Sequence, residues 1–397
     1  MKKNKILVLT PRFPFPVVGG DRLRIYKICQ ELSKYYELTL LSLCEDQTEL
    51  KYRVEEPIFT KIYRIFQPRL YSYFNVLKAI PTKKPLQIAY YYNEDFKLKV
   101  EKLIEEHDLT LSHLIRVGDY VKDKKGLHVL EMTDAISMNY ERASNSPSLF
   151  SFKKIIYSFE RSRLYNYEKA MVNHFSLISL ISSVDKNYLY AEPTINNIVV
   201  SGNGVDVEKY PFIARKIDLS DTVNLIFIGN MDTLQNFDAV TWFAKNILPE
   251  LQVIHTFNLK VVGKISEKNK CKLKKIPYIN VVGMVDNISV NVIDGHVGIC
   301  PMRIGAGVQN KILEYMALGL PTITSSVGFE GLGAIKEKEI IVADTVEEYK
   351  KALTLLLRDL GYYKKIAENG LDFVSNKFSW QSQLTNLVSG IGRLLEK

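Results

Sequence analysis

The sequence predicts an α/β protein built from two doubly wound domains. Short apolar runs alternate with amphipathic helical stretches, and this alternation restarts near the middle of the chain. Such alternation is typical of parallel sheets that helices cover on both faces. A length of 397 residues suffices for two domains with full cores, and the 46% hydrophobic and 24% charged residues are globular values.

The first half starts with an apolar strand at 5–10, a loop rich in Pro and Gly, and an amphipathic helix at 21–34. A second strand covers 37–43. Later strands are predicted at 111–115, 127–132, 177–181 and 197–201.

The second half repeats this pattern after Asp206. A strand at 224–230 and a helix at 237–251 open it. Short strands are then predicted at 259–263, 279–283, 297–301, 321–326 and 339–343.

Gly, Asn and Pro residues within 201–212 suit a hinge between the two halves. We therefore expect one domain at 1–205 and another at 206–377. The C-terminal segment 378–397 holds an amphipathic helix, which we expect to cross back to the first domain. The domains should face a central cleft at the carboxyl ends of their strands, where open α/β sheets bind ligands.

The most informative stretch follows the strand at 297–301. Gly305 and Gly307 let the backbone approach a ligand closely. The helix that begins near Val308 presents free N–H groups and a positive dipole end, which together make an anion site. A tight turn without a ligand is the alternative explanation.

Charged side chains surround this loop. Arg303 precedes it, and Lys311 lies on the first turn of the helix. Glu314 follows on an adjacent face, where a carboxylate can accept two ribose hydroxyls. The alternative is an ordinary i,i+3 ion pair between Lys311 and Glu314.

Residues 301–332, PMRIGAGVQNKILEYMALGLPTITSSVGFEGL, resemble the donor-site signature of the family-4-like (group 1) glycosyltransferases of the GT-B fold, in the version found in bacterial polysaccharide biosynthesis. Three further blocks resemble that family in the same order, at 17–34, 201–212 and 229–243. The matching positions of the signature are Pro301, Arg303, Gly305, Gly307, Lys311, Leu313, Glu314, Met316, Ala317, Gly319 and Pro321.

This resemblance implies two Rossmann-like domains, of which the first binds the acceptor and the second binds a nucleotide sugar. Glu314 would hold the donor ribose, while Arg303, Lys311 and the N–H groups around Val308 would hold the diphosphate. The expected donor-binding positions also include Gly19 and Gly20, Gly229 and Asn230, and the loop residues Gly305, Ala306, Gly307 and Gln309.

The chain departs from the family pattern at several of these positions. Ala306 stands where many relatives carry a second Glu, and Gln309 stands where the nearest ones often carry Arg. Asn230 and Gln235 are the nearest equivalents of an Arg and a Lys. Positive charge on the diphosphate must then come mainly from Arg303 and Lys311, and the identity of the sugar becomes harder to predict.

The first domain offers weaker candidates. Asp134 follows a strand and would face the cleft as a catalytic group; the alternative is that it caps the next helix. Arg142 and His113 are candidate acceptor-binding residues, and the alternative for His113 is a structural role.

The resemblance implies retaining, metal-independent transfer from a nucleoside diphosphate sugar, with no cofactor, to a glycan or a polyprenyl-diphosphate-linked glycan. The pathway would be capsule, O-antigen or exopolysaccharide biosynthesis. Asp134, Arg303, Lys311 and Glu314 would carry the catalysis. A catalytically silent nucleotide-sugar-binding subunit is one alternative. A dinucleotide-dependent oxidoreductase is another, but the loop at 11–22 lacks the GxGxxG spacing.

Residues 57–93 combine six Lys/Arg and nine aromatic residues with no acidic residue. This composition suits an anionic membrane surface or a lipid phosphate, and we expect no nucleic acid partner. The alternative is a solvated basic face over a normally packed helix pair. No apolar run reaches the length of a signal peptide or a membrane span, and the four cysteines are scattered. We expect a cytoplasmic protein, peripheral on the inner face of the membrane.

Overall fold

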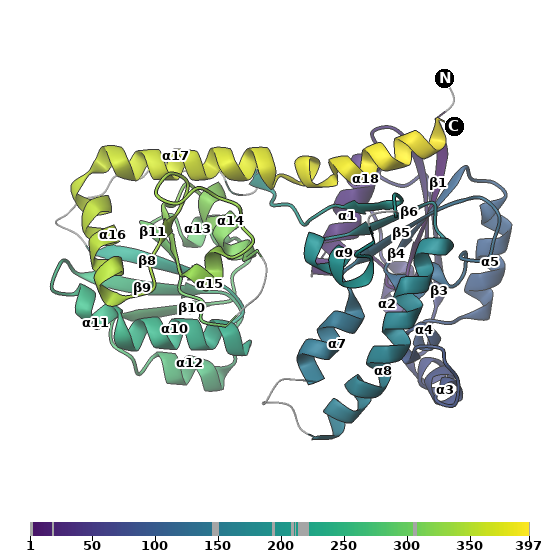
Figure 1. The fold of residues 1–397 in the computed structure, drawn as a ribbon, viewed down its shortest axis with the longest axis horizontal. Coiled ribbons are helices and arrows are strands. Elements are labelled where there is room, and N and C mark those ends of the chain that lie inside the picture. The colour runs from purple at the N-terminus through teal and green to yellow at the C-terminus, as the bar shows by residue number, and fades with distance from the viewer. Residues whose placement is uncertain are drawn as a thin grey trace. The chain divides into compact units, whose positions relative to one another are not determined.

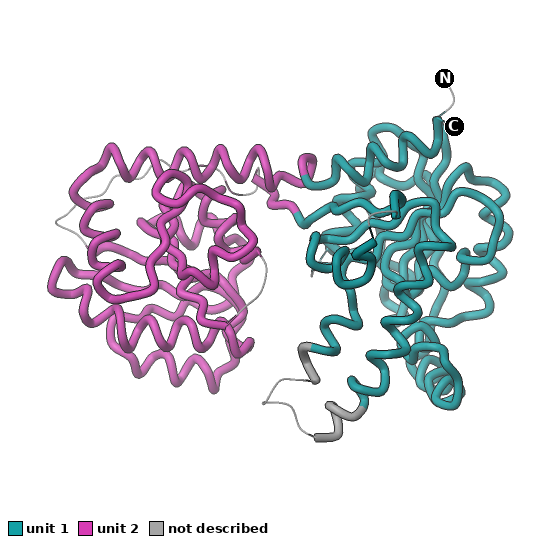
Figure 2. Tube along the Cα trace, viewed as in Figure 1, with its two compact units in different colours: residues 1–203, 383–397 teal, residues 204–382 magenta. Residues whose placement is uncertain are grey.

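The computed structural model describes residues 3–17, 20–144, 151–192, 195–207, 210, 212, 222–304 and 308–396. The chain divides into two compact units, which Figure 2 shows in different colours. Unit 1 comprises Met1–Asn203 and Gln383–Lys397, and unit 2 comprises Gly204–Ser382. The boundaries expected from the sequence, 205/206 and 377/378, lie a few residues from these.

Unit 1 is built on a parallel seven-stranded sheet with the order β3-β2-β1-β4-β5-β6-β7 (Figure 1). Chain order reverses between β1 and β4, which are neighbours in the sheet. The strands are β1 (Lys5–Thr10), β2 (Glu37–Cys44), β3 (Lys61–Phe66), β4 (Leu109–His113), β5 (Leu127–Thr133), β6 (Leu177–Leu180) and β7 (Ile198–Val200).

Helices cover this sheet, and most of them alternate with the strands along the chain. They are α1 (Gly20–Leu32), α2 (Gln47–Lys51), α3 (Arg69–Ala79), α4 (Leu86–Tyr90), α5 (Glu94–Ile104), α6 (Ile115–Gly118), α7 (Ile136–Ser144), α8 (Ser151–Ala170), the 3₁₀ turn η1 (Met171–Asn173), α9 (Ser183–Leu189) and α18 (Trp380–Leu395).

The C-terminal helix α18 completes unit 1. Leu384, Leu387 and Ile391 are buried, and Gly390 lies so close to β6 that a Cβ there would come within 2.7 Å of Leu177. Each apolar side chain buried in this way contributes about 1.5–3 kcal/mol. The helix is therefore an integral part of this unit.

A buried ion pair stands behind the carboxyl edge of the first sheet. The Arg24 Nε donates to Glu131 Oε1 at 2.7 Å, and both side chains are almost fully buried. The remaining Arg24 N–H groups donate to the carbonyls of Ser201 and Gly202 and to the Asn203 side chain. One side chain of α1 thus fixes the segment that follows β7, because a buried guanidinium needs all of these partners.

Unit 2 is built on a parallel six-stranded sheet with the order β10-β9-β8-β11-β12-β13. Its strands are β8 (Val223–Ile228), β9 (Phe257–Val262), β10 (Ile279–Gly283), β11 (Val297–Cys300), β12 (Thr322–Thr324) and β13 (Ile341–Val342). Its helices are α10 (Leu234–Asn246), α11 (Leu248–Leu251), α12 (Glu267–Leu273), α13 (Ile288–Asn291), α14 (Asn310–Ala317), α15 (Ser326–Phe329), α16 (Val346–Arg358) and α17 (Leu360–Lys377).

These two parallel sheets confirm the predicted fold class, and two local predictions were wrong. Strand β3 was not predicted, because it is a half-buried edge strand in which Lys61 and Arg64 interrupt the apolar run. The single helix predicted at 237–251 is two helices, α10 and α11. Pro249 lies in the first turn of α11 and has no N–H to continue α10.

Among the described residues, no helix combines the length and the hydropathy that are needed to cross a membrane.

Candidate functional site

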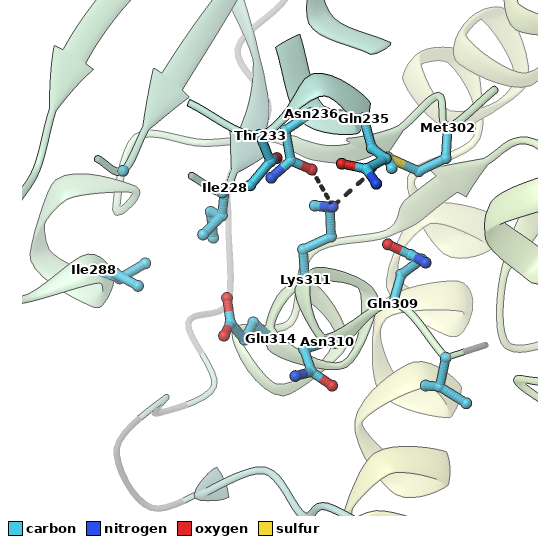
Figure 3. Close-up of a pocket in the computed structure, with 13 residues that line it drawn as sticks. Ile228, Thr233, Gln235, Asn236, Ile288, Met302, Gln309, Asn310, Lys311 and Glu314 are labelled. Atoms are coloured by element: carbon cyan, nitrogen blue, oxygen red, sulfur yellow. Dashed lines mark hydrogen bonds between the residues drawn. The ribbon is translucent and has the colours of Figure 1, made fainter. Parts of the chain in front are cut away.

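A cavity of about 570 Å³ lies at the carboxyl edge of the second sheet (Figure 3). Residues that follow or end β8, β9 and β11 line it, together with the first turns of α10 and α14. β8 and β11 are the neighbours at which the strand order reverses, the position where open α/β sheets bind ligands. The predicted residues that line this cavity are Gly229, Val308, Gln309, Lys311 and Glu314.

The edge of the cavity depends on two glycines in contact. Gly263, which follows β9, has a φ of +135°, and a Cβ there would lie 2.1 Å from the Gly229 carbonyl oxygen. A Cβ on Gly229 would in turn lie 2.8 Å from the Asn236 amide nitrogen. The backbone contact and the positive φ make glycine necessary at 263, and the absence of a side chain at Gly229 leaves room for the Asn236 side chain of α10.

Lys311 projects from the first turn of α14 toward α10. Its Nζ donates to Asn236 Oδ1 at 2.9 Å and lies 3.7 Å from Met302 Sδ (Figure 3). The Lys311 residue is only 9% exposed, and burial lowers its pKa. Its hydrogen-bond partner is a neutral amide, so no carboxylate cancels its charge at that contact.

Glu314 lines the same cavity from the next turn of α14. Burial raises the pKa of its carboxyl to about 7, and the nearby Lys311 ammonium offsets part of this rise. The i,i+3 ion pair that was the alternative explanation is not formed, because Lys311 donates to Asn236 instead. A half-ionised carboxylate and a desolvated ammonium therefore both line one cavity.

Helix α14 is rigidly held behind these side chains. The Tyr315 hydroxyl accepts from the backbone N–H of Ile228 at 2.8 Å and lies 3.3 Å from the Ile299 carbonyl. Its ring packs against Gly298, where a Cβ would come within 2.5 Å. The Gln309 side chain makes no capping bond at the start of α14, and the Ile312 N–H donates to the Gln309 carbonyl at 2.9 Å. Among the described residues, the N–H groups of Asn310 and Lys311 have no backbone acceptor, so they remain available to an anion.

Arg303 lies outside the residues that line the cavity. Its Nε is 3.8 Å from Asp238 Oδ2, its guanidinium lies 5.6 Å from the centre of the Trp242 ring, and the side chain is half exposed. The anchoring residues Asp238 and Trp242 both come from α10. Arg303 is thus held beside α10 and can turn toward solvent.

Asn230 also lies outside this lining. Its side-chain oxygen accepts from the backbone N–H of Asp232, and its carbonyl accepts from Asn236 Nδ2. It builds the turn after β8, while Gln235 lines the cavity. Of the other expected donor-binding positions, Gly19, Gly305, Ala306 and Gly307 lie outside the described residues.

Gly20 begins α1 in unit 1 and is exposed. A Cβ placed on it would meet no atom within 4 Å.

Of the candidate residues of unit 1, the structure describes the side chains of Asp134 and His113. Asp134 accepts from Asn139 Nδ2, and burial raises the pKa of Asp134. It does not cap α7 in the way proposed as its alternative role, since the first N–H groups of α7 donate to Glu168. Arg142 belongs to α7, and its side chain lies outside the described part of the chain.

His113 ends β4 and is buried. Its Nδ1 lies 2.6 Å from Glu131 Oε2, the carboxylate that also pairs with Arg24. His113 therefore contacts the same buried carboxylate as Arg24, which is the structural role that was its alternative.

Asn236 is the main residue of the cavity that the sequence did not single out. It is separated from Lys311 by 75 positions. The block at 229–243 contains it, but only the contact with Lys311 shows what it does. Thr233, Ile288 and Met302 line the cavity as well and were not predicted either.

The raised pKa of Glu314 predicts a pH-dependent effect on stability. Between its ordinary pKa of 4.5 and about 7, the folded protein keeps a proton that the unfolded chain releases, so this group lowers stability as the pH rises through that window. Glu314→Gln should therefore stabilise unit 2 at pH 8 by about 3 kcal/mol, because a pKa difference of one corresponds to about 1.4 kcal/mol, and should change nothing at pH 4. Calorimetric unfolding measures both, with exposed Glu347→Gln as control. Equal stability of variant and wild type at pH 8 would contradict the prediction.

Comparisons with known proteins agree with this fold. A family model described as "Glycosyl transferases group 1" matches residues 222–359, which include the whole cavity lining. Over 394 residues, the chain is 23% identical to an uncharacterized 44.6 kDa protein in the cps region of Klebsiella pneumoniae, with 94% of this chain and 96% of that protein covered.

Two solved structures illustrate the likeness of the fold. Sucrose-phosphate synthase from Thermosynechococcus elongatus superposes with a TM-score of 0.68 at 14% identity, over 99% of this chain and 100% of that one. Anabaena HepE, solved in complex with UDP-glucose, gives 0.62 at 14% identity, over 98% and 100%. The two Rossmann-like parallel sheets thus form a GT-B fold, and residues 222–359, around the cavity, match the group 1 glycosyltransferase domain.

Proposed function

We propose that the chain transfers a sugar from a nucleoside diphosphate sugar to a glycan or lipid-linked glycan during the synthesis of a cell-surface polysaccharide, with retention of the anomeric configuration and without a metal ion. The observation that carries the proposal is the cavity in which Lys311 and Glu314 lie at the open N-terminus of α14. The cps-region relative and the UDP-glucose complex of HepE support the pathway and the donor class.

The charge of Lys311 supports a diphosphate ligand. A buried ammonium that bonds only neutral groups is costly, and an anion that enters the cavity relieves this cost. The free N–H groups at the start of α14 and the nearby Arg303 add to the positive potential. These groups would stabilise the charge that develops on the diphosphate as the glycosidic bond breaks, which is the part a metal plays in other transferases.

Glu314 suits the ribose. An ionised carboxylate accepts hydrogen bonds from two hydroxyls, whereas in the protonated form one oxygen carries a proton and donates instead. The affinity for the nucleotide sugar should accordingly rise as the pH rises through the Glu314 pKa of about 7. For unit 1, we propose Asp134 at the end of β5 as the contact to the sugar.

Replacing either charged residue of α14 should abolish transfer. Lys311→Met and Glu314→Ala are expected to reduce the rate at least about a hundredfold, because each removes an interaction with the diphosphate or the ribose. A mass-spectrometric screen with UDP-, GDP- and dTDP-sugars, followed by titration of the accepted donor, measures both chemistry and binding. Lys364→Ala on the exposed face of α17 is the control.

Wild-type turnover in Lys311→Met would overturn the assignment of the site. Tight binding of a nucleotide sugar by the wild type with neither transfer nor hydrolysis would favour the catalytically silent subunit.

Asn236 should act by positioning Lys311. Asn236→Ala removes the acceptor and is expected to weaken donor binding about tenfold, the value of one hydrogen bond to a charged group. Asn236→Asp keeps an acceptor at 2.9 Å but places a carboxylate beside the Lys311 ammonium. Because this carboxylate offsets the positive charge, the variant should weaken nucleotide binding at least as much. Calorimetric titration of the donor nucleotide compares the two with Asn246→Ala at the end of α10. If Asn236→Asp bound the nucleotide as the wild type does, a positioning role would be wrong.

We further propose that α3 rests on an anionic membrane surface. Its exposed side chains include Leu70, Phe74 and Leu77, at 86%, 53% and 64% exposure. The Lys78 ammonium lies 4.4 Å from the centre of the Phe74 ring. Apolar side chains flanked by cations are typical of helices that lie in the lipid headgroup region.

Binding to vesicles tests this surface. The wild type should co-sediment with phosphatidylglycerol vesicles, and high salt should release it, because the attraction is partly electrostatic. Leu70→Asp/Leu77→Asp should reduce binding at least about tenfold, while Val253→Asp, an equally exposed site in unit 2, should not. Identical sedimentation of the α3 variant and the wild type would exclude α3 as the contact.

A further inference from the structure

Unit 1 contains a second cavity, of about 470 Å³, whose described lining includes neither Asp134 nor His113 but includes part of the basic, aromatic segment 57–93. It lies where four neighbouring strands of the first sheet end, in the order β3, β2, β1 and β4. Arg12 follows β1 and Arg116 follows β4, so the two arginines straddle the pair of strands at which the order of this sheet reverses. Geometry alone thus marks this cavity as a ligand site of unit 1.

The two arginines converge on one aromatic ring. The Arg12 Nε donates to the Tyr91 hydroxyl at 3.0 Å, and the guanidinium carbons of Arg12 and Arg116 lie 5.9 and 5.3 Å from the centre of the Tyr91 ring. Tyr91 is itself buried. Two cations are therefore held near each other by a fixed ring.

Positive charge is in excess at this point. Arg116 donates only to the neutral side chain of Gln87, and in the described part of the chain no carboxylate comes within 4 Å of its guanidinium. The nearest carboxylate to Arg12 is Asp21, at 3.6 Å between two half-exposed groups. In addition, Gln87 Nε2 is buried and has no hydrogen-bond partner in that part. Two charged donors and one neutral donor are thus left for a ligand.

The acidic residues of the cavity have partners of their own. Glu160 accepts from the backbone N–H of Leu86 at 2.7 Å and lies 3.6 Å from Arg163. Glu45 lies 3.9 Å from the Arg69 guanidinium. Each carboxylate thus has a neighbouring arginine other than Arg116, although Glu45 Oε1 and Glu160 Oε1 have no hydrogen-bond partner in the described part of the chain. Arg116 therefore keeps its charge.

Aromatic and apolar side chains complete the lining. Tyr73 and Val76 come from α3, Tyr140 comes from α7, and Ile156 comes from α8. Tyr73 and Ile156 are 58% and 40% exposed. Tyrosine rings have apolar faces and a polar hydroxyl. They therefore suit a ligand that combines a sugar ring or a hydrocarbon chain with a charged group.

We propose that this cavity holds a phosphate or diphosphate group of the acceptor, with Arg12, Arg116 and the Gln87 amide as its donors. Guanidinium groups bind phosphate oxygens through paired N–H donors, and two of them near one ring match a diphosphate. The inference rests on the proposed transferase function, since it makes this ligand the acceptor. The phosphate would belong either to a lipid-linked diphosphate sugar or to a water-soluble sugar phosphate.

The experiment is a titration of the full-length protein that has first been saturated with the donor nucleotide, so that the cavity of unit 2 is filled. The probes are geranylgeranyl diphosphate, uncharged geranylgeraniol and glucose 1-phosphate, each in the same detergent. We expect at least one phosphate-bearing probe to bind tenfold more tightly than geranylgeraniol. Arg116→Gln and Arg12→Gln should each weaken that binding at least tenfold, and Arg116→Lys should weaken it less.

Arg53→Gln, which removes an exposed cation of the same unit, is the charge-matched control. Unchanged thermal unfolding and unchanged nucleotide affinity show that a variant is folded. Tighter binding of geranylgeranyl diphosphate than of glucose 1-phosphate identifies a lipid-linked acceptor, and the reverse identifies a soluble one.

The proposal would be overturned if Arg12→Gln and Arg116→Gln both bound every probe with the affinity of the wild type. Equal affinities of the wild type for geranylgeraniol and geranylgeranyl diphosphate would overturn it as well. Failure of the proposed function looks different, because the first saturation step would then show no nucleotide binding at all.

Discussion

The hydrogen bond between Lys311 and Asn236 is the contact on which the arrangement of unit 2 depends. It joins the first turn of α14 to α10 across the ends of β8 and β11, and it fixes an ammonium in a place from which water is largely excluded. A carboxylate partner would have satisfied this cation permanently. The Asn236 amide instead orients the ammonium and leaves its positive charge to act on a ligand in the cavity. This arrangement lowers the stability of the folded protein, because a buried charge without a counter-ion is costly, but it provides a positive field at the site.

Both units place charged side chains at the strand ends where the order of their sheet reverses. Parallel strands are covered by helices on two faces, so polar side chains have room only at the strand ends, and a reversal of strand order leaves a gap there. In unit 2 this gap holds Lys311 and Glu314, and in unit 1 it holds Arg12 and Arg116. The buried pair of Arg24 and Glu131 differs because each charge is fully matched, which makes it a structural element.

Much of the fold could be predicted from the sequence, because continuous apolar runs such as 5–10 are long enough to mark strands that are buried on both faces. Strand β3 could not, since this edge strand has no fully buried residue and Lys61 and Arg64 interrupt its apolar run. The side chains on one helix, Lys311 and Glu314, were predictable from local spacing and family resemblance. The role of Asn236 and the cavity around Tyr91 could not be predicted, because both depend on contacts between segments that are far apart in the sequence.

The crossing of the C-terminal helix back to unit 1 has a consequence for how the protein is made. During synthesis on the ribosome, the strands of unit 1 emerge first, but Leu384, Leu387 and Ile391 fill its core only after all of unit 2 has been translated. Unit 2 is contiguous and can fold as soon as it emerges. The nascent first unit therefore lacks its contacts between the C-terminal helix and β6 for the whole of that interval, and a chain that is interrupted within its last fifteen residues keeps a complete second unit but an incomplete first one.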